Sequence, residues 1–138
     1  MRKIAKTILG LIIVTGYLLC PFITVQAEEP VLTPAHITAY NDTGIMKWGQ
    51  QTRPGVCAGS EEYKDCMIVV YQRLPDGSLG EFIGMFECLD TGGTKGLNNG
   101  TVIDVWKPTI EECQQFVDLT YSNGCKGKVF IQVIKGKG

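Results

Sequence analysis

The sequence has one histidine, His36, and its six cysteines form no C-x-x-C pair. Structural zinc sites need closely spaced cysteine and histidine ligands, so this pattern argues against a metal site, and no motif indicates a cofactor. We interpret His36 as a residue at a strand start or on the surface rather than as a catalytic group.

The sequence also has no excess of basic residues over acidic ones. Residues 1–27 carry three of the 13 basic residues and none of the 14 acidic ones, so ten basic and 14 acidic residues give residues 28–138 a net charge of −4. Proteins that track a phosphate backbone depend on a basic stripe, and none occurs here. The sequence therefore argues against a nucleic-acid partner.

The first 27 residues have the three parts of a secretory signal. Basic residues at positions 2, 3 and 6 precede an apolar stretch over residues 8–20, and Val25-Gln26-Ala27 resembles a cleavage site. We therefore predict a signal peptide over residues 1–27 and a protein that is secreted or held in the cell envelope. An uncleaved membrane anchor of marginal length and lipidation at Cys20 remain alternatives.

The 111 residues that follow the signal suffice for one domain of the commonest size but not for two. We divide them into a linker over residues 28–34 and a folded domain over residues 35–138. The domain is expected to be a monomer, with membrane contact only through an uncleaved signal segment.

Export favours disulfide bonds over metal ligation for the cysteines. The short loops between them predict the pairs Cys57–Cys66 and Cys113–Cys125. Cys88 is then left over, as a small buried hydrophobe or a reactive thiol. It lies two residues before Asp90, so strand alternation places the two side chains on the same face.

Apolar and alternating runs predict several short strands. They cover His36–Tyr40, Cys66–Arg73, Gly80–Leu89, Val102–Trp106 and Lys128–Lys135. The turn Pro75-Asp76-Gly77-Ser78 joins the second and third into a hairpin. Residues 47–60 have no period and are interpreted as a long loop that lines a site.

One helix is expected, from Ile110 to Tyr121 or Ser122, after a capping box that begins at Thr109 and ends at Glu112. Its apolar side is expected to include Ile110, Phe116 and Tyr121. Strands of this number and length favour a mainly β fold, a small closed barrel with one helix before the last strand, over a doubly wound sheet.

The segment from Cys88 to Trp106 is where we place the chemistry. Asp90 and Asp104 flank a glycine-rich loop, and each belongs to a strand-like run. Asp104 alternates with Ile103 and Val105, and a carboxylate in an apolar strand is costly to bury without a partner. For Asp90, an Asx turn before Thr91-Gly92-Gly93 is an equally simple interpretation.

These residues carry a resemblance to a known family. Asp90-Thr91-Gly92-Gly93, then Lys95-Gly96 and Ile103-Asp104-Val105, resemble the Asp-Asp-Asp (3D) domain family, which is related to the catalytic barrel of membrane-bound lytic transglycosylase A. The order of the first strand and of the last helix and strand also matches, so the resemblance spans roughly Ala35 to Ile134. It implies a six-stranded double-psi β-barrel that acts on the glycan strands of peptidoglycan.

The resemblance also implies roles for individual residues. Asp104 corresponds to the family's catalytic aspartate and Asp90 to its partner carboxylate. Tyr71 occupies the place of the family's first aspartate, and Asp65 is a possible substitute. The remaining expected substrate-binding residues are Thr52, Gly92, Gly93 and Lys95. Trp106 is expected either to stack on a sugar ring or to be a buried core tryptophan. The loop departs from the family pattern at Thr94 and by an insertion over residues 97–100.

A lytic transglycosylase needs only one catalytic carboxyl group, because the attacking group is the muramyl 6-hydroxyl of the substrate. That acid must be neutral when substrate binds, so its pKa must be raised, and we expect Asp90 and an apolar setting to raise it in Asp104. The expected function is cleavage of the MurNAc–GlcNAc bond. A noncatalytic, expansin-like peptidoglycan-binding module is the alternative.

Overall fold

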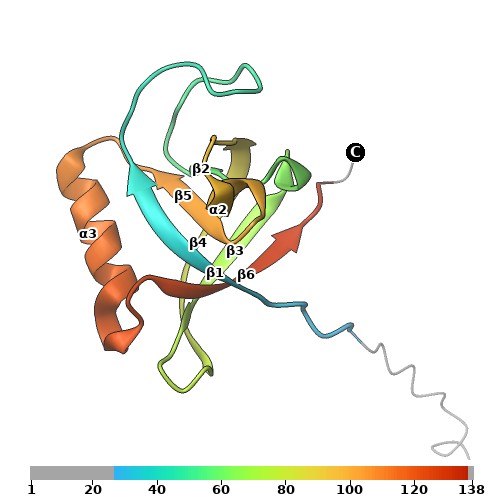
Figure 1. Ribbon diagram of the computed structural model, residues 1–138, viewed down its shortest axis with the longest axis vertical. Coiled ribbons are helices and arrows are strands. Elements are labelled where there is room, and N and C mark those ends of the chain that lie inside the picture. The colour runs from blue at the N-terminus through green and yellow to red at the C-terminus, as the bar shows by residue number, and fades with distance from the viewer. Residues whose placement is uncertain (1–26, 137–138) are drawn as a thin grey trace, which may run out of the picture.

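The computed structural model describes residues 27–136 (Figure 1). Residues 1–26 of the predicted signal peptide, including Cys20, lie outside the described residues. Within the described part, no helix has both the length and the apolar character that a membrane crossing requires. The predicted linker is irregular over residues 28–32, and its last two residues already belong to the first strand.

Six strands close into a barrel in the order β1-β5-β2-β4-β3-β6. This confirms the predicted small barrel with one helix before the last strand. The pairs β1–β5 and β2–β4 are parallel and the other four are antiparallel. The strands are β1 (Thr33–Tyr40), β2 (Val56–Ala58), β3 (Met67–Arg73), β4 (Leu79–Asp90), β5 (Val102–Trp106) and β6 (Lys128–Ile134).

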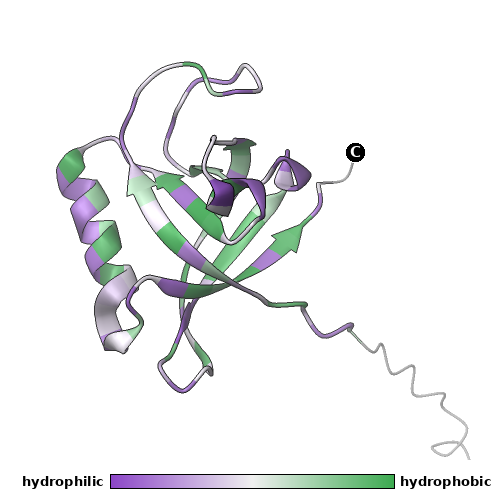
Figure 2. Cartoon of the chain, viewed as in Figure 1, coloured by the Kyte–Doolittle hydropathy of each residue, from purple (hydrophilic) through white to green (hydrophobic). Residues whose placement is uncertain are grey.

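Hydrophobic and hydrophilic residues alternate along parts of the strands, as the colouring in Figure 2 shows. The buried hydrophobic residues fill the barrel. Ile103 and Val105 of β5 are fully buried in the main interior cluster. Trp106 belongs to a second cluster on the outer face, together with Met46, Val56 and Leu89. The predicted alternation in β5 is therefore correct, because adjacent residues of a strand point to opposite faces.

Helix α3 (Ile110–Tyr121) has the predicted bounds, and the Thr109 hydroxyl caps it by accepting a hydrogen bond from the Glu112 N–H at 3.1 Å. Phe116 is buried and meets the ring of Phe86 edge to face at 5.8 Å. The prediction that Ile110 and Tyr121 belong to the buried side of the helix is wrong, because Ile110 is 69% and Tyr121 55% exposed. The helix packs mainly against β1 and buries Phe116 and Thr120.

Four short elements were not expected from the sequence. Strand β2 lies inside the predicted loop over residues 47–60, and a one-turn helix, α2 (Lys95–Asn98), follows the glycine pair. The 3-10 turns η1 (Glu61–Tyr63) and η2 (Ser122–Gly124) complete the set. Elements of three or four residues are too short for a hydrophobic period to reveal them.

The five cysteines of residues 27–136 are free thiols, so neither predicted disulfide is formed. Cys57 instead lies opposite Cys88 in the β2–β4 ladder, and its thiol donates to the Cys88 sulfur, which raises the pKa of Cys57 further than its burial alone. Cys113 and Cys125 lie toward opposite ends of α3, because eight residues of helix rise by about 12 Å.

A buried amide ties the end of α3 to the barrel. Gln72 of β3 is fully buried, and its amide nitrogen donates to Leu119 O at 3.0 Å and to Ser122 Oγ at 2.8 Å. Its oxygen accepts from Asn123 Nδ2 at 3.0 Å. A buried amide with all these partners holds one arrangement of the helix end.

We expect Gln72→Ala to lower the free energy of unfolding by about 2–4 kcal/mol, because it leaves buried partners unsatisfied and opens a cavity. Urea unfolding followed by circular dichroism measures the change. Gln115→Ala, at an exposed position of α3, is the matched control and should change stability by less than about 0.5 kcal/mol. Equal stability of the two variants would contradict the anchoring role.

Candidate functional site

Asp90 and Asp104 lie at one level of the barrel, on the two strands that flank β2. Ala58 of β2 pairs with Asp104 of β5 on one side and with Asp90 of β4 on the other. Paired residues of a ladder share a face, so both aspartates point outward, about 10 Å apart at their Cα atoms for two strand spacings. The structure thus brings the two predicted residues to one face.

A bulge in β4 turns Asp90 to this face. The register pairs Cys57 with Cys88 but Ala58 with Asp90, so one extra residue, Leu89, is accommodated between them. Cys88 therefore points into the barrel and Asp90 points out, and the expectation that they share a face is wrong. Bulges of this kind re-aim side chains and are common beside functional sites.

Asp104 is the half-buried carboxyl group of the site. Thr38, its partner in the parallel β1–β5 ladder, donates its hydroxyl hydrogen to Asp104 Oδ1 at 2.8 Å. Burial raises the pKa of Asp104, the Thr38 hydrogen bond opposes this, and the negative charge of Asp42 adds to the rise. Asp42, rather than the expected Asp90, is thus the carboxylate that acts on Asp104.

Asp90 fixes the backbone around it. Its Oδ1 accepts hydrogen bonds from the N–H groups of Lys47 and Thr91, each at 2.9 Å. The bond to Thr91 reaches only the next residue, whereas an Asx turn would bind the N–H of Gly92. The bond to Lys47 joins β4 to the segment over residues 41–55, here named the roof segment. Asp90 therefore holds the roof segment beside Asp104.

Tyr40 is the functional candidate that the sequence did not indicate. Its hydroxyl is buried and has no hydrogen-bond partner within residues 27–136. Burial raises the pKa of Tyr40, and the charges of Asp90 and then Asp104 raise it further, so the neutral phenol lies near both carboxylates. Alternation along β1 puts Tyr40 on the same face as Thr38, but only the parallel register brings that face beside Asp104.

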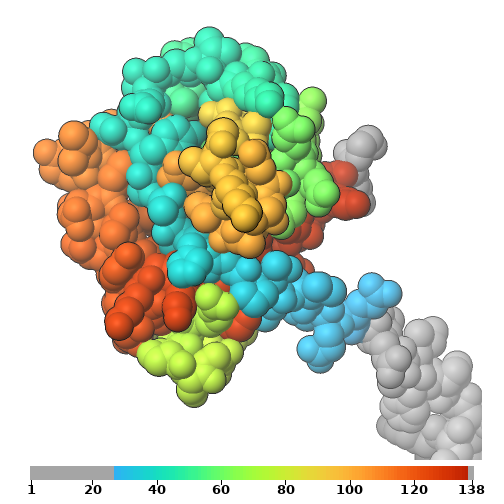
Figure 3. Space-filling view, in the orientation of Figure 1, coloured from blue at the N-terminus to red at the C-terminus, as the bar shows by residue number. Residues whose placement is uncertain are grey.

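The roof segment packs as a cap over the top of the molecule, next to the segment that contains α2 (Figure 3). Trp106 Nε1 donates to Asp42 O at 2.8 Å beneath it. The ion pair between Lys47 and Glu61 at 2.8 Å ties the segment to η1. Trp106 is 6% exposed, which leaves no open ring face for a sugar and makes it an anchor of the roof segment.

The two glycines of the glycine-rich loop, Gly92 and Gly93, differ in how much space surrounds them. A Cβ at Gly92 would clash with Leu97 Cδ1, so this glycine permits the packing of α2, whereas nothing lies within 4 Å of a Cβ at Gly93. Lys95 is exposed at the start of α2. Gly93 and Lys95 are therefore accessible to a ligand, and Gly92 has a structural reason to be glycine.

Thr52 and Asp65 lie in different surroundings. Thr52 belongs to the roof segment, where its hydroxyl accepts from the Gly44 N–H at 3.3 Å. Asp65 is exposed, has a φ of 61°, and binds Cys88 O through its backbone N–H. Asp65 does not contribute to the raised pKa of Asp104 or Tyr40, so the structure does not join it to the other aspartates.

Comparison of the chain with models of known protein families, with curated proteins and with solved structures finds no match. The chemistry must therefore be argued from the geometry. A half-buried carboxyl group with a raised pKa, oriented by a hydroxyl donor, is suited to transfer a proton to and from a ligand on this face.

We expect Asp104→Asn to gain stability relative to the natural chain as the pH rises. A carboxyl group whose pKa is higher in the folded than in the unfolded protein stabilises the fold below its unfolded pKa and loses that contribution as the pH rises through the folded pKa. Asparagine cannot ionise but still accepts from Thr38. Urea unfolding between about pH 3 and pH 7 measures the difference.

Asp76→Asn is the control with the opposite sign. Hydrogen bonds from Ser78 lower the pKa of Asp76, so its contribution exists above the unfolded pKa and is lost as the pH falls. If the difference in the free energy of unfolding between Asp104→Asn and the natural chain did not change with pH, the pKa of Asp104 would be the same in the folded and unfolded protein.

Proposed function

We propose that the chain is an exported protein that cleaves peptidoglycan glycan strands in the manner of a lytic transglycosylase, with Asp104 as the general acid and base. Its resemblance to the 3D domain family favours this reaction. The single observation that carries the proposal is the outward-facing Asp104, whose pKa burial raises and whose orientation Thr38 fixes. The expected ligand is the glycan strand, bound along the outer face beside the roof segment.

In the proposed reaction Asp104 begins protonated, as its raised pKa favours. It gives its proton to the oxygen that links MurNAc C1 to GlcNAc, and that C1–O bond breaks with oxocarbenium character at C1. The Asp104 carboxylate then removes the proton of the muramyl 6-hydroxyl, and O6 bonds to C1. The products are a 1,6-anhydro end and a free GlcNAc hydroxyl, and Asp104 is protonated again.

The other residues have supporting parts. Tyr40 lies beneath this face with a buried, neutral hydroxyl, whose pKa is raised by burial and by the charges of Asp90 and Asp104. Asp90 positions the roof segment through two backbone N–H groups rather than acting on the bond itself. Gly93 and Lys95 are exposed on the loop between β4 and β5 and are the loop residues open to a ligand.

A noncatalytic, expansin-like peptidoglycan-binding module is the second candidate. The observation that favours it is the role of Asp90, because Oδ1 of this carboxylate accepts two backbone N–H groups and so has a structural reason to be present without bond cleavage. In that case the outer face binds glycan without breaking a bond. The variants described next separate the two functions.

We expect Asp104→Asn to abolish the release of 1,6-anhydromuropeptides from purified murein, a loss of at least about 100-fold, because asparagine cannot transfer the proton. Mass spectrometry of the soluble products measures it, and pull-down with insoluble murein shows whether the variant still binds. Full turnover by this variant would remove Asp104 from the mechanism. Binding by the natural chain without any release of fragments would favour the module.

Thr38→Val is the matched control, because it keeps the carboxyl group and removes the hydrogen bond that lowers its pKa. The pKa of Asp104 should rise, so activity should persist to higher pH than in the natural chain. Asp42→Asn removes a charge that raises the same pKa and should move the alkaline limit of activity to lower pH. Shifts in the same direction for both variants would contradict the electrostatic account.

A pair of substitutions tests the role of Asp90. Asp90→Asn keeps an oxygen that accepts from Lys47 N and Thr91 N, whereas Asp90→Ala removes it. If Asp90 positions the roof segment, the asparagine variant should retain most of its activity and the alanine variant should lose about tenfold or more. Anhydromuropeptide release measures both, and equal inactivation would instead assign the charge of Asp90 to the reaction.

A further inference from the structure

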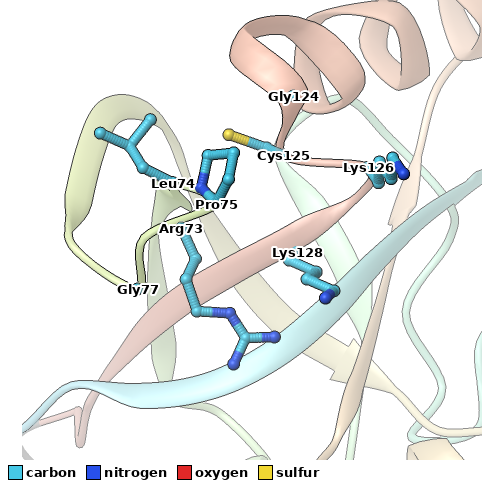
Figure 4. Close-up of a pocket in the computed structure, with 8 residues that line it drawn as sticks. All are labelled: Arg73, Leu74, Pro75, Gly77, Gly124, Cys125, Lys126 and Lys128. Carbon is cyan, nitrogen blue, oxygen red and sulfur yellow. The ribbon is translucent and has the colours of Figure 1, made fainter.

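A pocket of about 370 Å³ lies at the end of the barrel away from Asp90 and Asp104. It is formed between the turn that joins β3 to β4 and the connection from α3 to β6 (Figure 4). Three of its eight lining residues, Arg73, Lys126 and Lys128, are cationic, and none is acidic. Its volume is at the lower end of the range of small-molecule sites.

The strand register places like charges side by side at this pocket. Gln72 pairs with Val129 in the antiparallel β3–β6 ladder, so the next position sets Arg73 opposite Lys128. On the other side of β6, His36 of β1 pairs with Lys128. Cations directly opposite each other in adjacent strands destabilise a sheet, unless a negative charge is bound between them.

The protein itself does not supply that negative charge. The ion pairs within residues 27–136 are Lys47–Glu61 and Arg53–Glu87, and neither involves a cation of the pocket. Asp76 lies in the adjacent turn, but its carboxylate accepts from the N–H and the hydroxyl of Ser78. Glu81 acts on the Cys125 thiol and does not line the pocket.

Arg73 also has an unsatisfied donor. Its Nε is buried without a hydrogen-bond partner in the described part of the chain. The guanidinium carbon lies 5.7 Å from the centre of the Phe130 ring, which holds the group against β6. This Nε is closed to solvent, so what Arg73 offers a ligand is the charge of a guanidinium that is held in place and that no ion pair in the described part of the chain balances.

We propose that this pocket binds a phosphate group carried on a small organic ligand. A phosphate dianion balances two of the three cations, whereas a carboxylate balances one, and arginine with lysine is the usual pair for phosphate recognition. Leu74 and Pro75 supply an apolar wall for the organic part. The site is separate from the proposed glycan face and does not depend on the function proposed for it.

Titration of the purified chain with glycerol 3-phosphate, inorganic phosphate and acetate at low salt tests this proposal, with the amide NMR signals of residues 124–128 as the readout. Glycerol 3-phosphate should give saturable shifts and bind most tightly, and acetate should bind about tenfold more weakly than either phosphate. If glycerol 3-phosphate and inorganic phosphate bound with equal affinity, the proposal that the ligand has an organic part would be wrong. If acetate bound as tightly as the phosphates, the proposal of a phosphate site would be wrong.

Arg73→Gln and Lys128→Gln should each weaken binding of glycerol 3-phosphate by about tenfold. Lys128→Gln removes a like-charge contact, so it should fold at least as well as the natural chain in phosphate-free buffer. Lys135→Gln, an exposed cation at the other end of β6, is the matched control and should leave binding unchanged. Unchanged affinity in both pocket variants, or no saturable shift in the natural chain, would overturn the site.

Discussion

The barrel closes through three residues, and the candidate site depends on that closure. Val56–Ala58 pairs with β5 on one side and β4 on the other, so without it the sheet would have two open edges. The same pairing sets Asp104 and Asp90 on either side of Ala58. The bulge beside Ala58 turns Asp90 outward. The pairing that closes the barrel therefore also fixes the positions of Asp90 and Asp104.

Much of this architecture could be predicted from the sequence. The alternation over Val102–Trp106 correctly separated interior residues from Trp106, and the capping box gave the bounds of α3. Such features are local, so a single segment contains the signal for them. The partnered position of Asp104 was also foreseeable, because a carboxylate in an apolar strand is costly unless its face is open or a partner binds it, and Thr38 binds it here.

The rest depends on contacts between distant segments. Thr38 and Tyr40 join the site only through the parallel register of β1 and β5, and Asp42 acts on Asp104 from a segment with no period. The disulfide pairs were chosen by loop length, yet the ladder sets Cys57 against Cys88. Register and bulges are decided by the packing of the whole sheet, so short-range patterns do not reveal them.

Charge at the two ends of the barrel acts independently. The proposed glycan face and the cationic pocket are separated by the length of β4, whose 12 residues span up to roughly 35 Å. Interactions between exposed charges are largely screened beyond about 8–10 Å at physiological salt. The cations of the pocket therefore do not lower the pKa of Asp104, which its own burial and Asp42 raise. A ligand in the pocket can alter the proton chemistry at Asp104 only by moving the strands between them, because electrostatic coupling over that distance is too weak.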